Sequence, residues 1–126
     1  MNVLGIGMDI VETKRIAESL ERFGDRFLQR VFLEGEVVYS LSMKFPHLHL
    51  AARFAAKEAI SKAFGTGIGR ELGWRDLEIV RAPNGAPGVR LHGRAGALAK
   101  ARGVTQVLVS LSHTDGYGAA SAILVG

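Results

Sequence analysis

The chain has 126 residues, 48% of them hydrophobic, and no low-complexity tract, which predicts one globular domain and excludes a disordered protein. It contains no cysteine, so disulfides and thiolate metal sites are excluded. The formal net charge of +4 and the pI of about 9.9 favour an acidic partner, which could be nucleic acid, an anionic membrane, a phosphorylated ligand or an acidic protein. The N-terminus lacks the basic flank of a signal peptide, and no stretch approaches the roughly 20 apolar residues of a membrane span, so a cytoplasmic protein is expected.

A strand is predicted from residue 3 to residue 11, because its side chains fall into two faces of different character. One face would carry Leu4, Ile6, Met8 and Ile10, and the other Val3, Gly5, Gly7, Asp9 and Val11. The two glycines leave room for another backbone or a ligand to approach beside Asp9. A buried carboxylate needs a partner, so Asp9 either belongs to a binding site or faces water near the strand end, and the pattern leaves both open.

A helix should follow this strand, with Thr13 as its N-cap. Gly24 is a candidate break in the helix. Four apolar residues recur at helical spacing and are expected to face the core: Ile16, Leu20, Phe23 and Phe27.

A mostly basic stripe runs beside these apolar residues and consists of Arg15, Ser19, Arg22 and Arg26. One interpretation is a solvated face with weak ion pairs to Glu18 and Glu21. The other interpretation is a docking face for an acidic partner. The charge pattern alone favours the solvated face.

Another helix is predicted over residues 34–43 and would be ended by Pro46. His47 and His49 would then lie in a short connector. Two histidines with no evident third ligand are a weak metal signal, so both are expected to be surface residues. The inward-facing residues of this helix would be Val37, Val38 and Leu41.

The longest helix is predicted over residues 50–64, which are rich in alanine and free of proline, and Gly65 should end it. Glu58 and Lys62 lie four residues apart and therefore share one face of this helix. One possibility is an exposed ion pair within the helix. The other is a site for a metal and phosphates, with Asp9 and Glu58 as candidate magnesium ligands because they are the acids in the least polar surroundings.

The second half of the chain alternates glycine-rich turns with short elements. Strands are predicted over residues 74–81, 89–92, 104–111 and 117–125, and a short helix over residues 95–102. The last two strands would form an antiparallel hairpin whose connector contains His113, a candidate phosphate donor, base or turn residue. The expected fold class is α+β.

Four stretches of the sequence together resemble one family. They are residues 5–12 with Arg15 (GIGMDIVE), residues 53–59 with 62–67 (RFAAKEA and KAFGTG), residues 84–87 (NGAP) and residues 111–114 (LSHT). In order and in chain length they resemble the holo-[acyl-carrier-protein] synthases, which are small 4'-phosphopantetheinyl transferases. The resemblance implies their fold, an antiparallel sheet with a long central helix.

The resemblance implies transfer of the 4'-phosphopantetheine group from coenzyme A to a serine of apo-acyl carrier protein, with release of 3',5'-ADP. It implies that Asp9 and Glu58 bind Mg²⁺ beside the coenzyme A pyrophosphate. Lys62 would stabilise charge on the phosphates, and Glu58, directly or through water, would help to remove the serine proton. Contacts to the nucleotide and its phosphates are expected from Arg53, Gly65, Thr66, Gly67, Asn84 and His113.

The resemblance also changes the interpretation of the basic stripe. Because the carrier proteins are acidic, Arg15, Arg22 and Arg26 become the expected docking residues. The family resemblance further implies a homotrimer with each site between two subunits, and a protein partner in place of nucleic acid or a membrane. Gly118 stands where the family more often has alanine, which is expected to loosen the start of the last strand. The competing hypothesis is a non-catalytic basic module that binds nucleic acid or a nucleotide.

Overall fold

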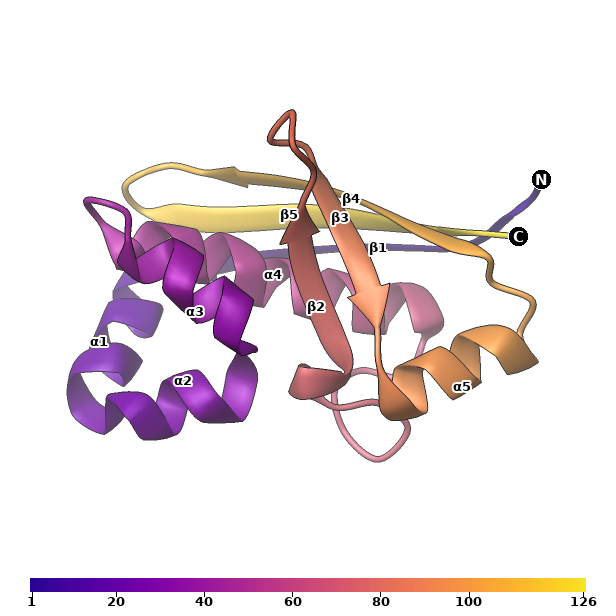
Figure 1. Ribbon diagram of the computed structural model, residues 1–126, viewed down its shortest axis with the longest axis horizontal. Coiled ribbons are helices and arrows are strands. Elements are labelled where there is room, and N and C mark those ends of the chain that lie inside the picture. Colours follow the sequence, from indigo (N-terminus) through magenta and orange to yellow (C-terminus); the bar gives the residue numbers. More distant parts are fainter.

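The computed structural model describes residues 1–126. Its larger sheet has three antiparallel strands in the order β1 (Val3–Glu12), β5 (Tyr117–Val125) and β4 (Gln106–His113). The 19-residue helix α4 (Pro46–Phe64) lies along one face of this sheet (Figure 1). The two chain ends lie at the same end of the sheet, where Asn2 and Gly126 exchange backbone hydrogen bonds. The predicted α+β fold with an antiparallel sheet and a long central helix is confirmed.

Glycines on β1 allow α4 to approach the sheet very closely. A Cβ atom on Gly7 would lie 2.0 Å from the carbonyl oxygen of Ala59, and one on Gly5 would lie 2.2 Å from that of Ala63. Any larger residue would push the helix away. The room predicted beside Asp9 is therefore filled by the chain's own helix.

Gly118 makes the same kind of contact from β5. A Cβ atom there would lie 2.7 Å from the backbone carbonyl carbon of Ala51 on α4. Gly118 is buried and pairs in register with His113 of β4. The expectation that this glycine loosens the strand start is wrong, because its missing side chain is what allows the strand and the helix to touch.

Helix α4 begins four residues earlier than predicted, because Pro46 occupies its first turn. Proline suits that position, since its fixed φ is helical and its missing N–H has no partner there in any helix. His47 and His49 therefore belong to the helix and do not form a connector. Gly65, with φ of 77°, ends the helix as predicted.

Three short helices pack beside α4 (Figure 1): α1 (Thr13–Phe23), α2 (Asp25–Val31) and α3 (Glu34–Leu41). Gly24, with φ of 54°, separates α1 from α2, so the predicted break is confirmed. The helical spacing does not continue across this break, and Phe23 is exposed where a core position was predicted. Thr13 is the first residue of α1 and not its N-cap, because its hydroxyl donates to the Asp115 carbonyl oxygen at 2.6 Å.

Helix α3 is rotated relative to the prediction. Val38 and Leu41 are exposed, whereas Glu36 and Ser40 are buried. These two residues lie one turn apart and share the inner face of the helix. The rotation follows from the buried partner of Glu36 on α4, described below.

A second, two-stranded antiparallel sheet lies in front of the first (Figure 1) and contains β2 (Leu77–Arg81) and β3 (Pro87–Leu91). The short 3-10 turn η1 (Trp74–Asp76) occupies the predicted start of β2, because the Asp76 carboxylate accepts a hydrogen bond from the Gly73 N–H and closes the turn. Helix α5 (Gly93–Ala101) then leads to β4, which begins at Gln106 and includes His113 as its last residue.

The outer face of β1, at one edge of the three-stranded sheet, is apolar and uncovered. Ile6, Met8 and Ile10 of β1 are 73%, 69% and 64% exposed. An exposed apolar strip of this kind indicates a surface that associates with another protein surface. No helix of the chain is long and apolar enough to cross a membrane.

Candidate active site

The first group of polar residues joins β1 to α4 and is called here the carboxylate site: Asp9, Glu58 and Lys62. The close packing of Gly7 against α4 carries Asp9 to the helix face that holds the other two residues. Lys62 Nζ donates to Asp9 Oδ1 at 2.8 Å and to the Met8 carbonyl oxygen at 3.3 Å. The ion-pair partner of Lys62 is thus Asp9, and the alternative of a Glu58–Lys62 pair within the helix is wrong.

The charges of the carboxylate site interact strongly. Burial, and after it the charge of Asp9, raise the pKa of Glu58, while Lys62 acts in the opposite direction. The hydrogen bond to Asp9 raises the pKa of Lys62. A carboxylate whose ionisation is disfavoured by a neighbouring carboxylate lies in a suitable environment for a cation.

The donor set of this site fits Mg²⁺. No third histidine, aspartate or glutamate joins Asp9 and Glu58. Mg²⁺ typically takes one or two carboxylates and completes its shell with water and substrate phosphates, so the two carboxylates of this site match that requirement.

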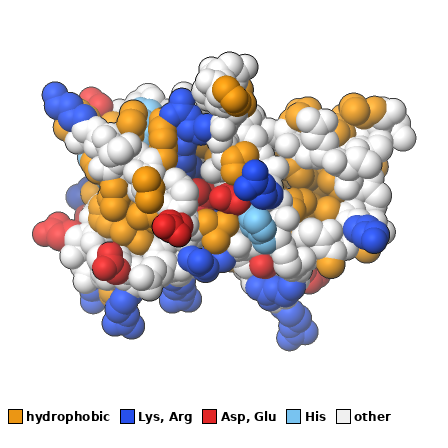
Figure 2. Space-filling view, in the orientation of Figure 1, with side chains coloured by type: hydrophobic (Ala, Val, Ile, Leu, Met, Phe, Trp, Pro, Cys, Tyr) orange, Lys and Arg blue, Asp and Glu red, His pale blue; other side chains and the backbone are white.

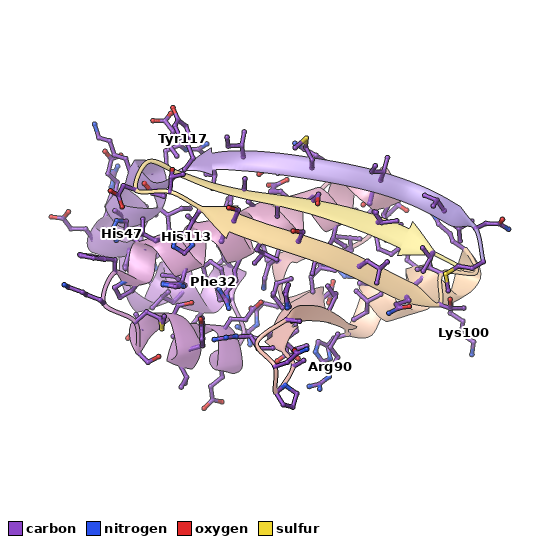
Figure 3. The ribbon with its side chains drawn as sticks, turned by 90° about the horizontal axis from the view of Figure 1, so that it is seen from above. Phe32, His47, Arg90, Lys100, His113 and Tyr117 are labelled. Carbon is purple, nitrogen blue, oxygen red and sulfur yellow. The ribbon has the colours of Figure 1, made fainter.

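A second group of residues lies over the N-terminal half of α4 and is called here the cationic–aromatic cluster: Tyr39, His49, Arg53, Arg81 and His113. The guanidinium carbons of Arg53 and Arg81 each lie 4.4 Å from the centroid of the Tyr39 ring. The His49 ring contacts the Tyr39 ring edge to face and approaches the His113 ring with centroids 4.9 Å apart. Figure 3 shows His113 at the same end of the molecule as His47 in the first turn of α4, far from Lys100.

Positive charge is concentrated in this cluster. Burial lowers the pKa of His49, and His113, Arg53 and Arg81 lower it further, so His49 is neutral at neutral pH. Burial also lowers the pKa of Arg53, and Tyr39 and Glu36 offset that effect. Guanidinium and imidazole groups gathered this way are suited to binding phosphate oxygens.

The two groups lie on different faces of α4. Arg53 and Glu58 are five residues apart, which in an α-helix corresponds to a rotation of roughly 140°. A ligand held by the carboxylate site of one chain therefore approaches α4 from a different side than a ligand held by its cationic–aromatic cluster. The two groups are therefore separate surfaces of one chain.

The remaining predicted nucleotide contacts lie outside both groups. Asn84 is exposed in the β2–β3 turn, where its Oδ1 accepts a hydrogen bond from the Ala86 N–H at 3.0 Å. The backbone N–H groups of Gly65, Thr66 and Gly67 donate to carbonyl oxygens of Ser61 and Lys62 and so close α4. Contacts from this turn to a ligand remain a prediction that depends on the Thr66 side chain and on the open space beside the glycines.

Sequence reasoning missed Tyr39, His49 and Arg81 as members of the cluster. His49 and Arg53 are four residues apart on one helix face, where the Arg53 Nη1 donates to the His49 carbonyl oxygen at 3.3 Å. That spacing becomes informative only if the helix is taken to begin at Pro46. Tyr39 and Arg81 come from other elements, and no local pattern connects them to α4.

The basic stripe forms an exposed face on α1 and α2, and Lys and Arg side chains gather along this lower edge of the molecule in Figure 2. Glu18 pairs with Lys14 at 4.0 Å, so the predicted ion pairs of the stripe with Glu18 and Glu21 do not form. Arg15, Arg22 and Arg26 have no acidic partner within the chain. Beside them lies a groove of about 270 Å³ lined by Ser19, Phe23, Arg26, Phe27 and Arg30.

Known proteins are similar to this chain in sequence and in fold. Residues 5–120 match the 4'-phosphopantetheinyl transferase superfamily. The holo-[acyl-carrier-protein] synthase of Koribacter versatilis is 47% identical over 97% of this chain and 98% of its own length. The crystal structure of the holo-[acyl-carrier-protein] synthase of Neisseria meningitidis superposes with a TM-score of 0.91 at 31% identity, covering 99% of this chain and 100% of that one.

The Helicobacter pylori holo-[acyl-carrier-protein] synthase, solved in complex with coenzyme A, superposes with a TM-score of 0.85 at 32% identity over 95% of this chain and 99% of that one. Sequence and fold agree over nearly the whole length. The chain belongs to the 4'-phosphopantetheinyl transferase superfamily and, within it, to the holo-[acyl-carrier-protein] synthases.

Proposed function

We propose that this chain transfers the 4'-phosphopantetheine group of coenzyme A to a serine of an apo-acyl carrier protein and releases 3',5'-ADP. The observation that carries the proposal is the carboxylate site, in which residues 49 and 53 positions apart in sequence meet at the positions where the chain resembles the family. Membership of the holo-[acyl-carrier-protein] synthases, and the coenzyme A bound by the Helicobacter pylori relative, support it.

The carboxylate site would supply the reaction centre. Asp9 and Glu58 would hold Mg²⁺, which when bound neutralises the pyrophosphate and polarises the phosphorus under attack. The serine Oγ forms a bond to that phosphorus as the bond to the 3',5'-ADP oxygen breaks. Lys62, which donates to Asp9 in the free chain, moves to the phosphate oxygens and stabilises their growing charge.

A base must accept the serine proton during this attack. Glu58 is the candidate, directly or through water, because it is the carboxylate of this site that accepts no hydrogen bond from Lys62.

The active assembly would contain more than one copy of the chain. The two half-sites lie on different faces of α4, and the outer face of β1 is apolar and uncovered. Packing of three such faces around a threefold axis would bury Ile6, Met8 and Ile10 and set the carboxylate site of one chain against the cationic–aromatic cluster of the next. Arg53, Asn84 and His113 would then bind the nucleotide end of coenzyme A.

The carrier protein would dock on the basic face. Arg15, Arg22 and Arg26 are exposed and unpaired, and an acidic surface would complement their charge. The adjacent groove, with Phe23 and Phe27 in its wall, would accept an apolar side chain of the carrier.

The test is incubation of the chain with coenzyme A, Mg²⁺ and an apo-acyl carrier protein, followed by intact mass measurement. The carrier is expected to gain the mass of one phosphopantetheine group, and removal of Mg²⁺ with a chelator should stop the gain. A carrier of unchanged mass, together with retained binding of coenzyme A, would favour the basic nucleotide-binding module instead.

A further inference from the structure

An ion pair lies buried at the centre of the molecule and takes no part in the chemistry described above. Lys57 of α4 and Glu36 of α3 are both fully buried, and the Lys57 Nζ lies 2.7 Å from Glu36 Oε1. The Nζ also lies 5.4 Å from the centroid of the Phe32 ring, which Figure 3 shows within the layer of helices. Lys57 directly precedes Glu58 of the carboxylate site.

The pair is completed by hydrogen bonds to three other segments. Lys57 Nζ donates to the carbonyl oxygens of Val31 at 2.7 Å and Trp74 at 3.1 Å. The Glu36 carboxylate accepts from the N–H groups of Leu33 at 2.7 Å and Ile79 at 2.8 Å. The middle of α4 is thereby tied to the end of α2, the start of α3, the turn η1 and the strand β2.

Stability alone is a poor explanation for this arrangement. Removing two charges from water costs about as much as their attraction returns, and apolar side chains of similar volume often serve equally well. What an apolar pair cannot supply is direction, because each of the five polar contacts fixes both a distance and an orientation.

The contacts of the pair connect the docking surface to the reaction centre. Val31 is the last residue of α2, and α1 and α2 carry the basic face and its groove. Helix α4 carries Glu58 and Lys62. A shift of α2 relative to α4 would move a docked carrier serine relative to the phosphorus that it attacks.

We propose that the Glu36–Lys57 pair is a positioning element, which sets the distance between the carrier-docking helices and the carboxylate site. The proposal rests on the transferase function proposed above. Because a misplacement of about 1 Å can cost about 100-fold in rate, loss of the pair should lower kcat far more than it weakens the binding of either substrate.

The test compares a charge-free double variant, Glu36→Gln with Lys57→Met, with the wild-type chain. The glutamine can still accept one backbone N–H and donate to a carbonyl oxygen, so no charge is left buried and unpaired. We expect kcat to fall about 100-fold, with the KM for coenzyme A within about twofold of wild type. A folded double variant with wild-type kcat, whether or not its KM values are raised, would overturn the proposal.

The matched control is Ile60→Val, which removes one methylene from an equally buried residue of the same helix. It should lower the melting temperature while leaving kcat unchanged. If Ile60→Val lost as much kcat as the double variant, the effect of the pair would be a general consequence of destabilisation.

If the double variant fails to fold, Lys57→Arg decides, because it keeps the charge and changes the geometry. Its kcat should fall at least tenfold, and a wild-type kcat would contradict the proposal. Absence of transfer by the wild-type chain would instead refute the proposed function.

Discussion

The carboxylate site and the cationic–aromatic cluster share one helix but are built in opposite ways. In the carboxylate site, the charges of two acids interact and a lysine pairs with one of them, Asp9, which the β1 glycines bring to α4. In the cluster, two arginines and His49 contact the ring of one tyrosine, and His113 packs against His49. The first has the chemistry of a cation site and the second that of an anion site. Because they face different sides of α4, the proposed function combines the carboxylate site of one chain with the cluster of another.

The largest effect is expected from the carboxylate site. Asp9→Ala and Glu58→Ala should each lower the transfer rate by about 1,000-fold or more, since each removes a ligand of an ion that contributes several kcal/mol to transition-state stabilisation. Circular dichroism should show both variants folded, because neither residue belongs to the core. Full transfer rates for both variants in Mg²⁺ would refute the metal assignment.

The cluster should respond differently. Arg53→Met is expected to weaken coenzyme A binding by about 10- to 100-fold, because it removes a charge-assisted contact to phosphate. Calorimetry measures the affinity for coenzyme A, and Mn²⁺ binding measured by electron paramagnetic resonance should stay unchanged. The control is Arg90→Gln, an exposed arginine that pairs with Glu78 outside both half-sites. Loss of Mn²⁺ binding in the Arg53 variant would contradict the separation of the two half-sites.

The docking face should affect only the carrier. Arg15→Glu is expected to raise the KM for the carrier by about tenfold, because reversing a charge costs complementarity across the interface. The KM for coenzyme A should not change. Lys100→Glu makes the same charge change on α5, at the other end of the molecule (Figure 3), and should leave both KM values unchanged. If Arg15→Glu raised the KM for the carrier and the KM for coenzyme A equally, this face would not be the carrier-docking surface.

The smallest effect concerns pH. Glu58 must be ionised to bind a cation, and its pKa is raised by burial and by Asp9. As the pH falls, Mn²⁺ affinity should therefore decline at a higher pH than the ordinary glutamate value of 4.5 would give. In Asp9→Asn the remaining affinity should decline at lower pH, because the neighbouring charge is gone. If the Mn²⁺ affinity of the wild-type chain declined only near the ordinary glutamate value of 4.5, the raised pKa of Glu58 would be contradicted.

Local pattern predicted the elements that carry the carboxylate site. Strand β1 follows from alternation, α4 follows from its alanines, and the charges of Asp9 and Glu58 stand out in apolar surroundings. The partner of Lys62 was not predictable from spacing, because Glu58, four residues earlier, and Asp9 were both available acids. The close approach at Gly7 decides between them.

Other features depend on contacts between distant residues. Phe23 fits the helical pattern but lies beside the break at Gly24, which frees it from the core. Glu36 has the sequence context of an exposed acid in a first helical turn, and only its pairing with Lys57 explains why it is buried. Neither fact can be obtained from periodicity, because both are set by how separate helices pack.

If one active site combines half-sites of two chains, a mixture of two inactive variants should regain activity. Asp9→Ala lacks the carboxylate site and keeps the cluster, whereas Arg53→Met with His113→Ala lacks the cluster and keeps the carboxylate site. If the chains of an equimolar mixture redistribute at random in closed trimers, about one quarter of the sites should pair two intact halves and recover about a quarter of wild-type activity. A mixture whose chains have exchanged but that stays as inactive as its components would contradict the account.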